Sequence, residues 1–377
     1  MGDPRFDTLA ELLVHYSCAL EPDDNVLIEA TDIPHGFTRA LVRAVAAGGG
    51  RPLVTLKSNT VLRDLMCNAS EPQMKLMGEI EAQRMAEVQA YIGVRGQPNV
   101  SEWSDVPPEK MLLYETLYRK PVHSELRVPK TRWVVLRWPT ASMAQQAEMS
   151  TEAFEDFFFR VCTLDYAKMS RAMVPLIERM QRTDRVRLVA PGTDLRFSIA
   201  GIPTRACDGH RNIPDGEVFT APVRTSVEGT IQYNTPTIYQ GVTHNDVRLR
   251  FEHGRIVEAS SSDSQHLTTV LDMDPGARYV GEFAVAFNPH ITQPIKDILF
   301  DEKIAGSIHF TPGNAYDDAD NGNRSQVHWD FVLRMSPEVG GGEVWFDDVL
   351  IRKDGRFILP DLEPLNPEHL AGTQASG

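Results

Sequence analysis

Short apolar runs alternate with helical patterns through the first half of the chain. The strand-like runs are residues 25–30, 52–57, 90–94 and 133–138, and helical periodicity covers residues 37–47 and 71–88. Repetition of strand, helix and strand predicts a mainly parallel sheet with helices in its crossovers. The glycines at 48–50 follow a helix rather than open one, which favours a helix end over a phosphate-binding loop.

The pattern changes in the second half of the chain. Between residues 151 and 182 apolar side chains recur with helical spacing, and their many phenylalanines and methionines are typical of core packing. Beyond residue 185, short alternating strands are separated by turns. These strands are expected at 186–189, 230–233, 247–251, 279–286, 307–311, 327–335 and 343–351.

We therefore expect two domains. Residues 1–184 form an α/β N-terminal domain with a mainly parallel sheet and a helical linker, and residues 185–377 form an α+β, β-rich C-terminal domain that binds metal. A chain of 377 residues exceeds the usual size of a single core, which agrees with this division.

Composition narrows the class of partner. The net charge of −14 disfavours nucleic acid and anionic membranes, which would be repelled. The four cysteines form no close pair, so neither a disulfide framework nor a thiolate zinc site is indicated, and a cytoplasmic setting is expected. No apolar run is long enough to span a membrane.

A possible ion site appears in the apolar run 327–331. His328 and Asp330 stand two positions apart, and because strand side chains alternate between faces, both would point the same way. That spacing suits one ion or one water. The same triplet is also common among ordinary surface residues.

Further candidate ligands recur in the second half. Glu217 follows a Pro-Asp-Gly turn, His309 lies among apolar neighbours, and Tyr316 comes a short turn later. Glu282 sits in a strand where a buried, unpaired carboxylate is costly unless a cation offsets it. A solvated glutamate or a hydrogen-bonded core histidine would explain each one singly. Together they favour a pair of zinc, cobalt or manganese ions, a common hydrolase arrangement.

Several segments around these positions resemble the aminopeptidase T family, which includes the staphylococcal and streptococcal aminopeptidases S. The segments are 139–166, 212–222, 227–236, 276–289, 298–316, 319–330 and 340–355. The resemblance implies a dinuclear metallo-aminopeptidase with an N-terminal α/β domain and a C-terminal catalytic domain. It also implies a homodimer whose subunits enclose the active sites in an internal cavity.

The resemblance also assigns roles to individual residues. Glu302 matches a further family carboxylate, and Tyr316 matches an active-site tyrosine. The positions that match the family's metal ligands are Glu217, Glu282, His309, His328 and Asp330.

The implied reaction removes the N-terminal residue from peptides that have a free N-terminus. Two ions would lower the pKa of a bridging water and polarise the scissile carbonyl. Glu217 or Glu302 would carry the proton to the leaving nitrogen, and Tyr316 would stabilise the oxyanion. Arg324 either contacts a substrate carboxylate or is a solvated loop residue.

Two alternatives come from other protein classes. Ring-cleaving 2,5-dihydroxypyridine dioxygenases share the fold and hold one ferrous ion, but they have a histidine at the Glu282 position and do not retain His309 as a ligand. His266 could complete an iron triad with His328 and Asp330, although its serine-rich segment suggests an exposed loop or helix start. A non-catalytic binding protein with a structural metal would need fewer ligands than are present.

Overall fold

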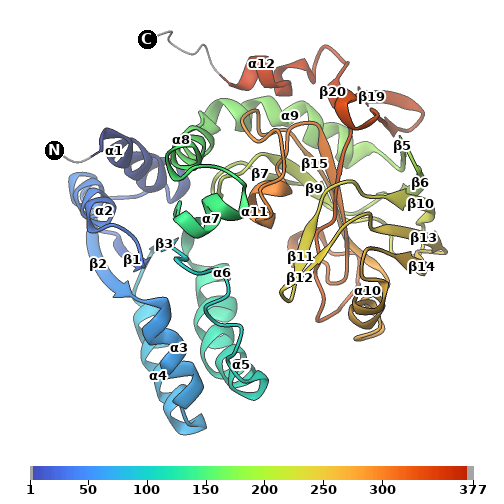
Figure 1. The fold of residues 1–377 in the computed structure, drawn as a ribbon. Helices are drawn as coiled ribbons and strands as arrows, with labels where there is room; N and C mark the ends of the chain where they lie inside the picture. The colour runs from blue at the N-terminus through green and yellow to red at the C-terminus, as the bar shows by residue number, and fades with distance from the viewer. Residues whose placement is uncertain (1–2, 372–377) are drawn as a thin grey trace. The chain divides into compact units, whose positions relative to one another are not determined.

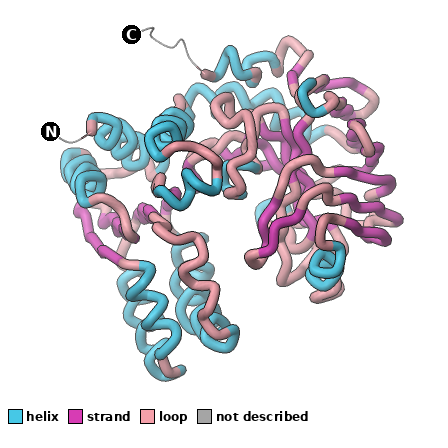
Figure 2. The backbone as a smooth tube through the Cα atoms, in the orientation of Figure 1, coloured by secondary structure: helices cyan, strands magenta, loops and turns pink. Residues whose placement is uncertain are grey.

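The computed structural model describes residues 3–371, which form two compact units. The first unit comprises the chain up to Thr163 together with Gly209–Ile213, and the second comprises Leu164–Asp208 and the chain from Pro214 onward. Figure 1 traces the elements of both units, and Figure 2 distinguishes their helices from their strands.

A wholly parallel five-stranded sheet forms the centre of the first unit. The strands follow the order β2 (Arg51–Lys57), β1 (Asn25–Thr31), β3 (Ala90–Arg95), β4 (Arg132–Arg137) and β8 (Asn212–Ile213). Val26, Leu27 and Ile28 of β1 are each at most 1% exposed, because helices cover both faces of a parallel sheet. The expected parallel α/β sheet is present.

One group of helices packs around an aromatic cluster of the first unit. Phe37 stacks on Trp138 with ring centroids 4.7 Å apart, and Phe6 meets both rings edge-on. The helices of this group are α1 (Pro4–Glu11), its continuation η1 (Leu12–Ser17), α2 (His35–Ala47), α7 (Ala141–Gln146) and α8 (Thr151–Cys162). The glycines after α2 end that helix as expected, and Gly49 has φ +82°.

A second group of helices continues the first unit beyond its strands (Figure 1). It comprises α3 (Asn59–Asn68), α4 (Glu71–Ala86), α5 (Pro108–Tyr114), η2 (Glu115–Arg127) and α6 (Val128–Lys130). Only α4 was expected from the sequence. Gly78 allows η2 to approach α4 closely, since a Cβ there would lie 1.9 Å from the Leu117 carbonyl oxygen.

Two antiparallel sheets form the core of the second unit. The larger has the order β14-β13-β10-β6-β5-β18-β19-β20. The smaller has the order β17 (Val332–Arg334), β16 (Ser307–Pro312), β15 (Val280–Ala286), β9 (Glu217–Thr220) and β7 (Arg205–Cys207). Phenylalanines join them: Phe197 of β6 (Thr193–Ser198) lies 5.0 Å from Phe283 and 4.9 Å from Phe310, measured between ring centroids. The second unit is therefore β-rich.

The remaining strands of the larger sheet are β5 (Arg185–Ala190), β10 (Glu228–Gln232), β13 (Arg248–Glu252), β14 (Arg255–Ser260), β18 (Glu343–Phe346), β19 (Val349–Lys353) and β20 (Arg356–Phe357). A separate hairpin pairs β11 (Thr237–Tyr239) with β12 (Val242–His244). The single strand expected at 343–351 is a hairpin, because Asp347 and Asp348 have φ of 46° and 66° and turn the chain between β18 and β19.

The two units divide at Thr163 rather than at the expected boundary of residue 184. The helical stretch 151–182 is two helices, α8 and α9 (Tyr166–Arg182), and α9 belongs to the second unit. There the Tyr166 hydroxyl accepts a hydrogen bond from the Asp215 backbone N–H, and Ser170 donates to Asp208. The chain also returns once to the first unit to add β8 beside β4.

Within residues 3–371, no helix combines the length and the apolar character needed to cross a membrane.

Candidate metal centre

Three neighbouring strands of the smaller sheet each contribute one predicted ligand. Glu217 begins β9 (Glu217–Thr220), Glu282 is on the central strand β15 (Val280–Ala286), and His309 is on β16 (Ser307–Pro312). Strand pairing brings them together, because β15 lies between β9 and β16. All three side chains are buried, with exposed fractions of 3%, 4% and 1%.

The three side chains are in direct contact. His309 Nδ1 lies 3.4 Å from Glu217 Oε2, and His309 Nε2 lies 3.4 Å from Glu282 Oε1. The second oxygen of Glu282 faces another imidazole, at 3.3 Å from His328 Nε2. Glu282 is thus shared, with one oxygen toward each histidine.

His328 and Asp330 reach the cluster from an irregular segment. The strand expected at 327–335 is only β17 (Val332–Arg334), and His328 forms an isolated bridge with Gly313. The two side chains nevertheless point the same way, with His328 Nε2 3.4 Å from Asp330 Oδ1. Thr311 holds the carboxylate by donating a 2.6 Å hydrogen bond to Asp330.

A close backbone approach orients the His328 ring. His328 Nδ1 lies 2.9 Å from the Asn314 carbonyl oxygen, so Nδ1 donates and Nε2 keeps its lone pair for the cluster. A Cβ at Gly281 would lie only 2.2 Å from that same oxygen. Glycine at 281 therefore permits the contact, at a bulge in β15 directly before Glu282.

The donor set fits divalent cations. Glu217 Oε2 and His309 Nδ1 are buried and have no hydrogen-bond partner among residues 3–371. Two groups have their donor atoms within 4.8 Å of one another: Glu217, Glu282 and His309, and then Glu282, His328 and Asp330. Imidazoles and carboxylates without a thiolate suit zinc, cobalt or manganese.

The protein's own charges show how strongly the cluster favours positive charge. Burial opposes the charged form of His309, yet Glu217 and Glu282 raise its pKa to about 10. Burial likewise opposes the charged form of His328, but Asp330 and Glu282 hold its pKa well above the ordinary value. The carboxylates thus make both imidazoles strongly basic. The same negative charge would favour a bound metal cation.

Lys303 is a member of the cluster that the sequence did not reveal. Its side chain is 1% exposed, and its ammonium contacts Glu217 and lies 2.7 Å from Glu302 and 3.6 Å from Asp215. Burial opposes its charged form, but Glu217, Glu302 and Asp215 raise its pKa well above the ordinary value. Its only sign in the sequence was a charged Asp-Glu-Lys run before an apolar strand.

A third possible ligand group involves the same lysine. Donor atoms of Cys207, Asp215 and Glu217 also lie within 4.8 Å of one another. Lys303 already contacts Glu217 and neighbours Asp215, so its positive charge compensates these carboxylates. We do not count this group as an ion site.

Glu302 and Tyr316 lie at the margin of the cluster. Glu302 follows α11 (Ile298–Asp301), pairs with Lys303 and belongs to neither ligand group. The Tyr316 ring centroid is 4.7 Å from that of His328, and its side chain is 46% exposed. Although much of the residue is exposed, burial of its phenol group, followed by the charges of Glu282 and Asp330, raises the pKa of Tyr316 well above its ordinary value.

Three other residues near these positions contact side chains outside the ligand groups. Arg324 is exposed and pairs with Asp320 at 2.7 Å, as expected of a solvated loop residue. His266, in the first turn of α10 (Ser264–Leu271), lies 2.9 Å from His244, measured between ring nitrogens. Trp329 stacks on Tyr239, which agrees with a packing role.

Comparisons with known proteins give consistent results. A family model described as thermophilic metalloprotease (M29) matches residues 3–357. Aminopeptidase T of Thermus aquaticus is 27% identical over 94% of this chain and 98% of the relative. Aminopeptidase 2 of Geobacillus stearothermophilus is 23% identical over 94% of this chain and 95% of the relative.

Two solved structures share the fold. Wild-type AmpT from Thermus thermophilus superposes with a TM-score of 0.79 at 24% identity, covering 94% of this chain and 99% of that one. The 2,5-dihydroxypyridine dioxygenase of Pseudomonas putida KT2440 gives a TM-score of 0.61 at 12% identity, covering 95% of this chain and 98% of that one. The fold alone therefore does not choose between the two chemistries.

Proposed function

We infer that this chain, which belongs to the thermophilic metalloprotease (M29) family, is a metal-dependent aminopeptidase that acts on peptides with a free N-terminus. The observation that supports this proposal most directly is the position of Glu282. Its two oxygens face two different histidines, at 3.4 Å from His309 and 3.3 Å from His328. A carboxylate shared in this way suits a pair of ions rather than one.

We assign the ligands accordingly. Glu217, Glu282 and His309 would hold one ion, and Glu282, His328 and Asp330 would hold the other. Zinc, cobalt or manganese fits these donors. When bound, such an ion pair supplies an activated water and polarises the scissile carbonyl.

The remaining side chains have roles in proton transfer and charge stabilisation. Glu302 is the candidate proton carrier, because it is free of both ligand groups and burial raises its pKa above the ordinary value. Lys303 is a positioning residue that holds Glu302 and Glu217 through its ammonium. Tyr316 keeps its proton at neutral pH, and its hydroxyl would donate to the developing oxyanion of the substrate.

The dioxygenase alternative has less support. It needs a histidine where this chain has Glu282, and it leaves His309 without a role although this ring lies between two carboxylates. His266, the other candidate for an iron triad, is bonded to His244. The expected homodimer remains a prediction drawn from the family resemblance, and the cytoplasmic setting remains a prediction drawn from the cysteine pattern.

The test combines metal analysis with activity on one preparation. We expect two divalent ions per chain together with hydrolysis of aminoacyl p-nitroanilides. Glu282→Gln should abolish turnover and lower the metal content while the protein stays folded, and His309→Ala should behave alike. Glu338→Gln, the same change at an exposed site, is the matched control.

Two results would overturn the proposal. One is full activity and full metal content in the Glu282→Gln variant, which would show that the ligand set is wrong. The other is one iron per chain with oxygen-dependent consumption of a dihydroxypyridine, which would assign the chain to the dioxygenase chemistry.

A further inference from the structure

The first unit contains a cavity of about 640 Å³ whose lining includes none of the residues assigned to the metal centre. Its lining includes the last residue of four parallel strands: Thr31, Lys57, Arg95 and Arg137. Open parallel sheets bind their ligands at the carboxyl ends of the strands. Position and size both favour a binding site for a small molecule.

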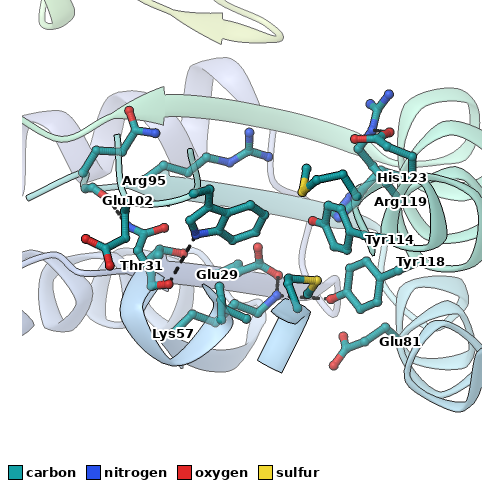
Figure 3. Close-up of a pocket in the computed structure, with 18 of the residues that line it drawn as sticks. Glu29, Thr31, Lys57, Glu81, Arg95, Glu102, Tyr114, Tyr118, Arg119 and His123 are labelled. Carbon is teal, nitrogen blue, oxygen red and sulfur yellow. Dashed lines mark hydrogen bonds and ion pairs between the residues drawn. The ribbon is translucent and has the colours of Figure 1, made fainter. Parts of the chain in front are cut away.

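The charges of the lining differ from those of the whole chain. Basic side chains outnumber acidic ones in the pocket, whereas the chain has a net charge of −14. Lys57 is engaged within the protein, at 2.7 Å from Glu29 and 3.3 Å from the Tyr118 hydroxyl (Figure 3). Arg119 pairs with Glu115. Arg95 extends from the other side of the pocket, opposite Tyr114 and Tyr118 (Figure 3).

Arg127 provides an unsatisfied donor at this cavity. Its side chain is 9% exposed and lies against the Trp133 ring, 4.2 Å from the centroid. Its Nε donates to His123 Nδ1 at 3.1 Å, but Nη1 is buried and has no hydrogen-bond partner among residues 3–371. A buried donor without a partner is destabilising, and Arg127 is one of the residues that line the cavity.

His123 adds a second donor beside Arg127. Burial, together with the charge of Arg127, lowers the pKa of His123 to about 3, so the ring is neutral at physiological pH. Because Nδ1 accepts the bond from Arg127, the ring proton is on Nε2. The pair therefore offers donors and no acceptor, which suits an acceptor-only group such as a carboxylate.

The other walls of the cavity are apolar and aromatic. Tyr114 and Tyr118 stack with ring centroids 5.2 Å apart, and Trp103 meets Tyr114 edge-on at 5.8 Å. Met66, Met77 and Met111 complete this wall. Such a surface packs against a flat or apolar body.

We propose that this pocket binds a small organic carboxylate with an aromatic or apolar body, held at its charged end by Arg127 and Arg95. Arginine donors match the two oxygens of a carboxylate. A phosphate would favour a glycine-rich loop at a helix start, and the glycines at 48–50 instead end α2 and precede the first residue of β2. The proposal does not depend on the aminopeptidase assignment.

The experiment is a calorimetric titration of the metal-loaded, full-length protein with N-acetylphenylalanine and, separately, with its neutral amide. The two probes differ in the carboxylate alone. We expect one site per chain for the carboxylate and affinity at least about tenfold weaker for the amide. Inorganic phosphate is the third probe and should bind more weakly than the carboxylate.

The variants locate the site. Arg95→Gln combined with Arg127→Gln should weaken binding at least about tenfold. Arg95→Gln alone removes an exposed side chain, should leave folding intact, and should weaken binding severalfold. Arg51→Gln is the matched control, because Arg51 is an exposed arginine at the opposite end of the same sheet.

Several results would overturn the proposal. They are equal affinity for the carboxylate and its amide, tighter binding of phosphate, unchanged binding in both Arg95 variants, and no binding at about 10 mM probe, a concentration that reveals even millimolar sites. Loss of binding in His309→Ala would place the probe at the metal centre instead and would also overturn it.

Discussion

Among residues 3–371, the carboxylate cluster of the second unit and the arginine-lined pocket of the first unit each contain a buried polar atom without a hydrogen-bond partner, but the atoms differ in kind. In the cluster the unsatisfied oxygen is Glu217 Oε2, an acceptor. In the pocket the unsatisfied nitrogen is Arg127 Nη1, a donor. An unsatisfied acceptor among carboxylates favours a cation, and an unsatisfied arginine donor favours an anion. The chemical type of the unsatisfied atom thus indicates the type of ligand.

Both regions also contain a lysine paired with glutamate, which is partly buried in the first unit and fully buried in the second. Lys57 in the first unit has one close carboxylate, Glu29, at 2.7 Å. Lys303 in the second unit has three carboxylates within 4 Å, on Glu217, Glu302 and Asp215. The first pair is balanced by itself. The second leaves excess negative charge, which is the electrostatic reason to expect metal there.

The largest effect is expected from removing these lysines. Lys303→Met should lower the free energy of unfolding of chelator-treated protein by about 3–5 kcal/mol, because it leaves buried carboxylates uncompensated. Lys57→Met should cost less, since Glu29 is the one carboxylate that loses its ion pair and the Tyr118 hydroxyl loses one hydrogen bond. Urea unfolding of both variants measures the difference.

Divalent metal sharpens this comparison. Added zinc or manganese should stabilise Lys57→Met as much as the unaltered protein, because its metal centre is intact. It should stabilise Lys303→Met by more, because the ions also neutralise the carboxylates that lost the lysine. Equal losses in the two variants, or equal stabilisation by metal, would show that the clusters do not differ as described.

A smaller effect is expected at Tyr316, where the cluster meets solvent. Tyr316→Phe should lower kcat about 100-fold, the usual consequence of losing one oxyanion donor, with little change in KM. Stability should be almost unchanged, because the side chain is 46% exposed. Tyr279→Phe is the control, since Arg224 stacks on that ring and the phenylalanine keeps the contact. A kcat equal to that of the unaltered protein would remove Tyr316 from the proposed chemistry.

The candidate ligands whose sequence neighbours are apolar could be predicted from the sequence. A buried carboxylate such as Glu282, or an imidazole such as His309 inside an apolar strand, is conspicuous because its neighbours show that it is buried. The role of Lys303 was not predictable, because Lys303 and Glu217 are 86 positions apart in the sequence and meet only in the folded chain. Arg127 was missed for a similar reason, since its burial depends on Trp133 and Tyr91.

For the fold, too, the sequence indicated local structure but not which distant segments pack together. Strand and helix periodicity predicted the parallel sheet and most antiparallel strands. It did not predict that α9 packs in the second unit, because an apolar helix face shows that the helix is buried but not against which core. Helices α3 and η2 were missed, and the contact that holds η2 against α4 depends on the small size of Gly78.

The two regions also shift the pKa of a histidine in opposite directions. The smallest predicted effect follows from this difference. Glu217 and Glu282 raise the pKa of His309 to about 10, whereas burial and Arg127 lower the pKa of His123 to about 3. Among the other charges facing His123, Arg95 and Lys57 lower its pKa and Glu29 raises it. The folded first unit therefore disfavours protonation of His123.

This shift predicts how stability depends on pH. The unfolded chain protonates His123 near pH 6.5, so the histidine's contribution is fully present above that pH and is lost as the pH falls toward 3. At pH 5 the loss should be about 2 kcal/mol. His123→Gln keeps an acceptor for Arg127 but cannot protonate, so its stability should fall less between pH 7 and pH 5 by that amount. Denaturant unfolding at both pH values measures this, with the exposed His253→Gln as control. An unchanged pH dependence in His123→Gln would show that the pocket tolerates a further positive charge, which would weaken the case that it binds an anion.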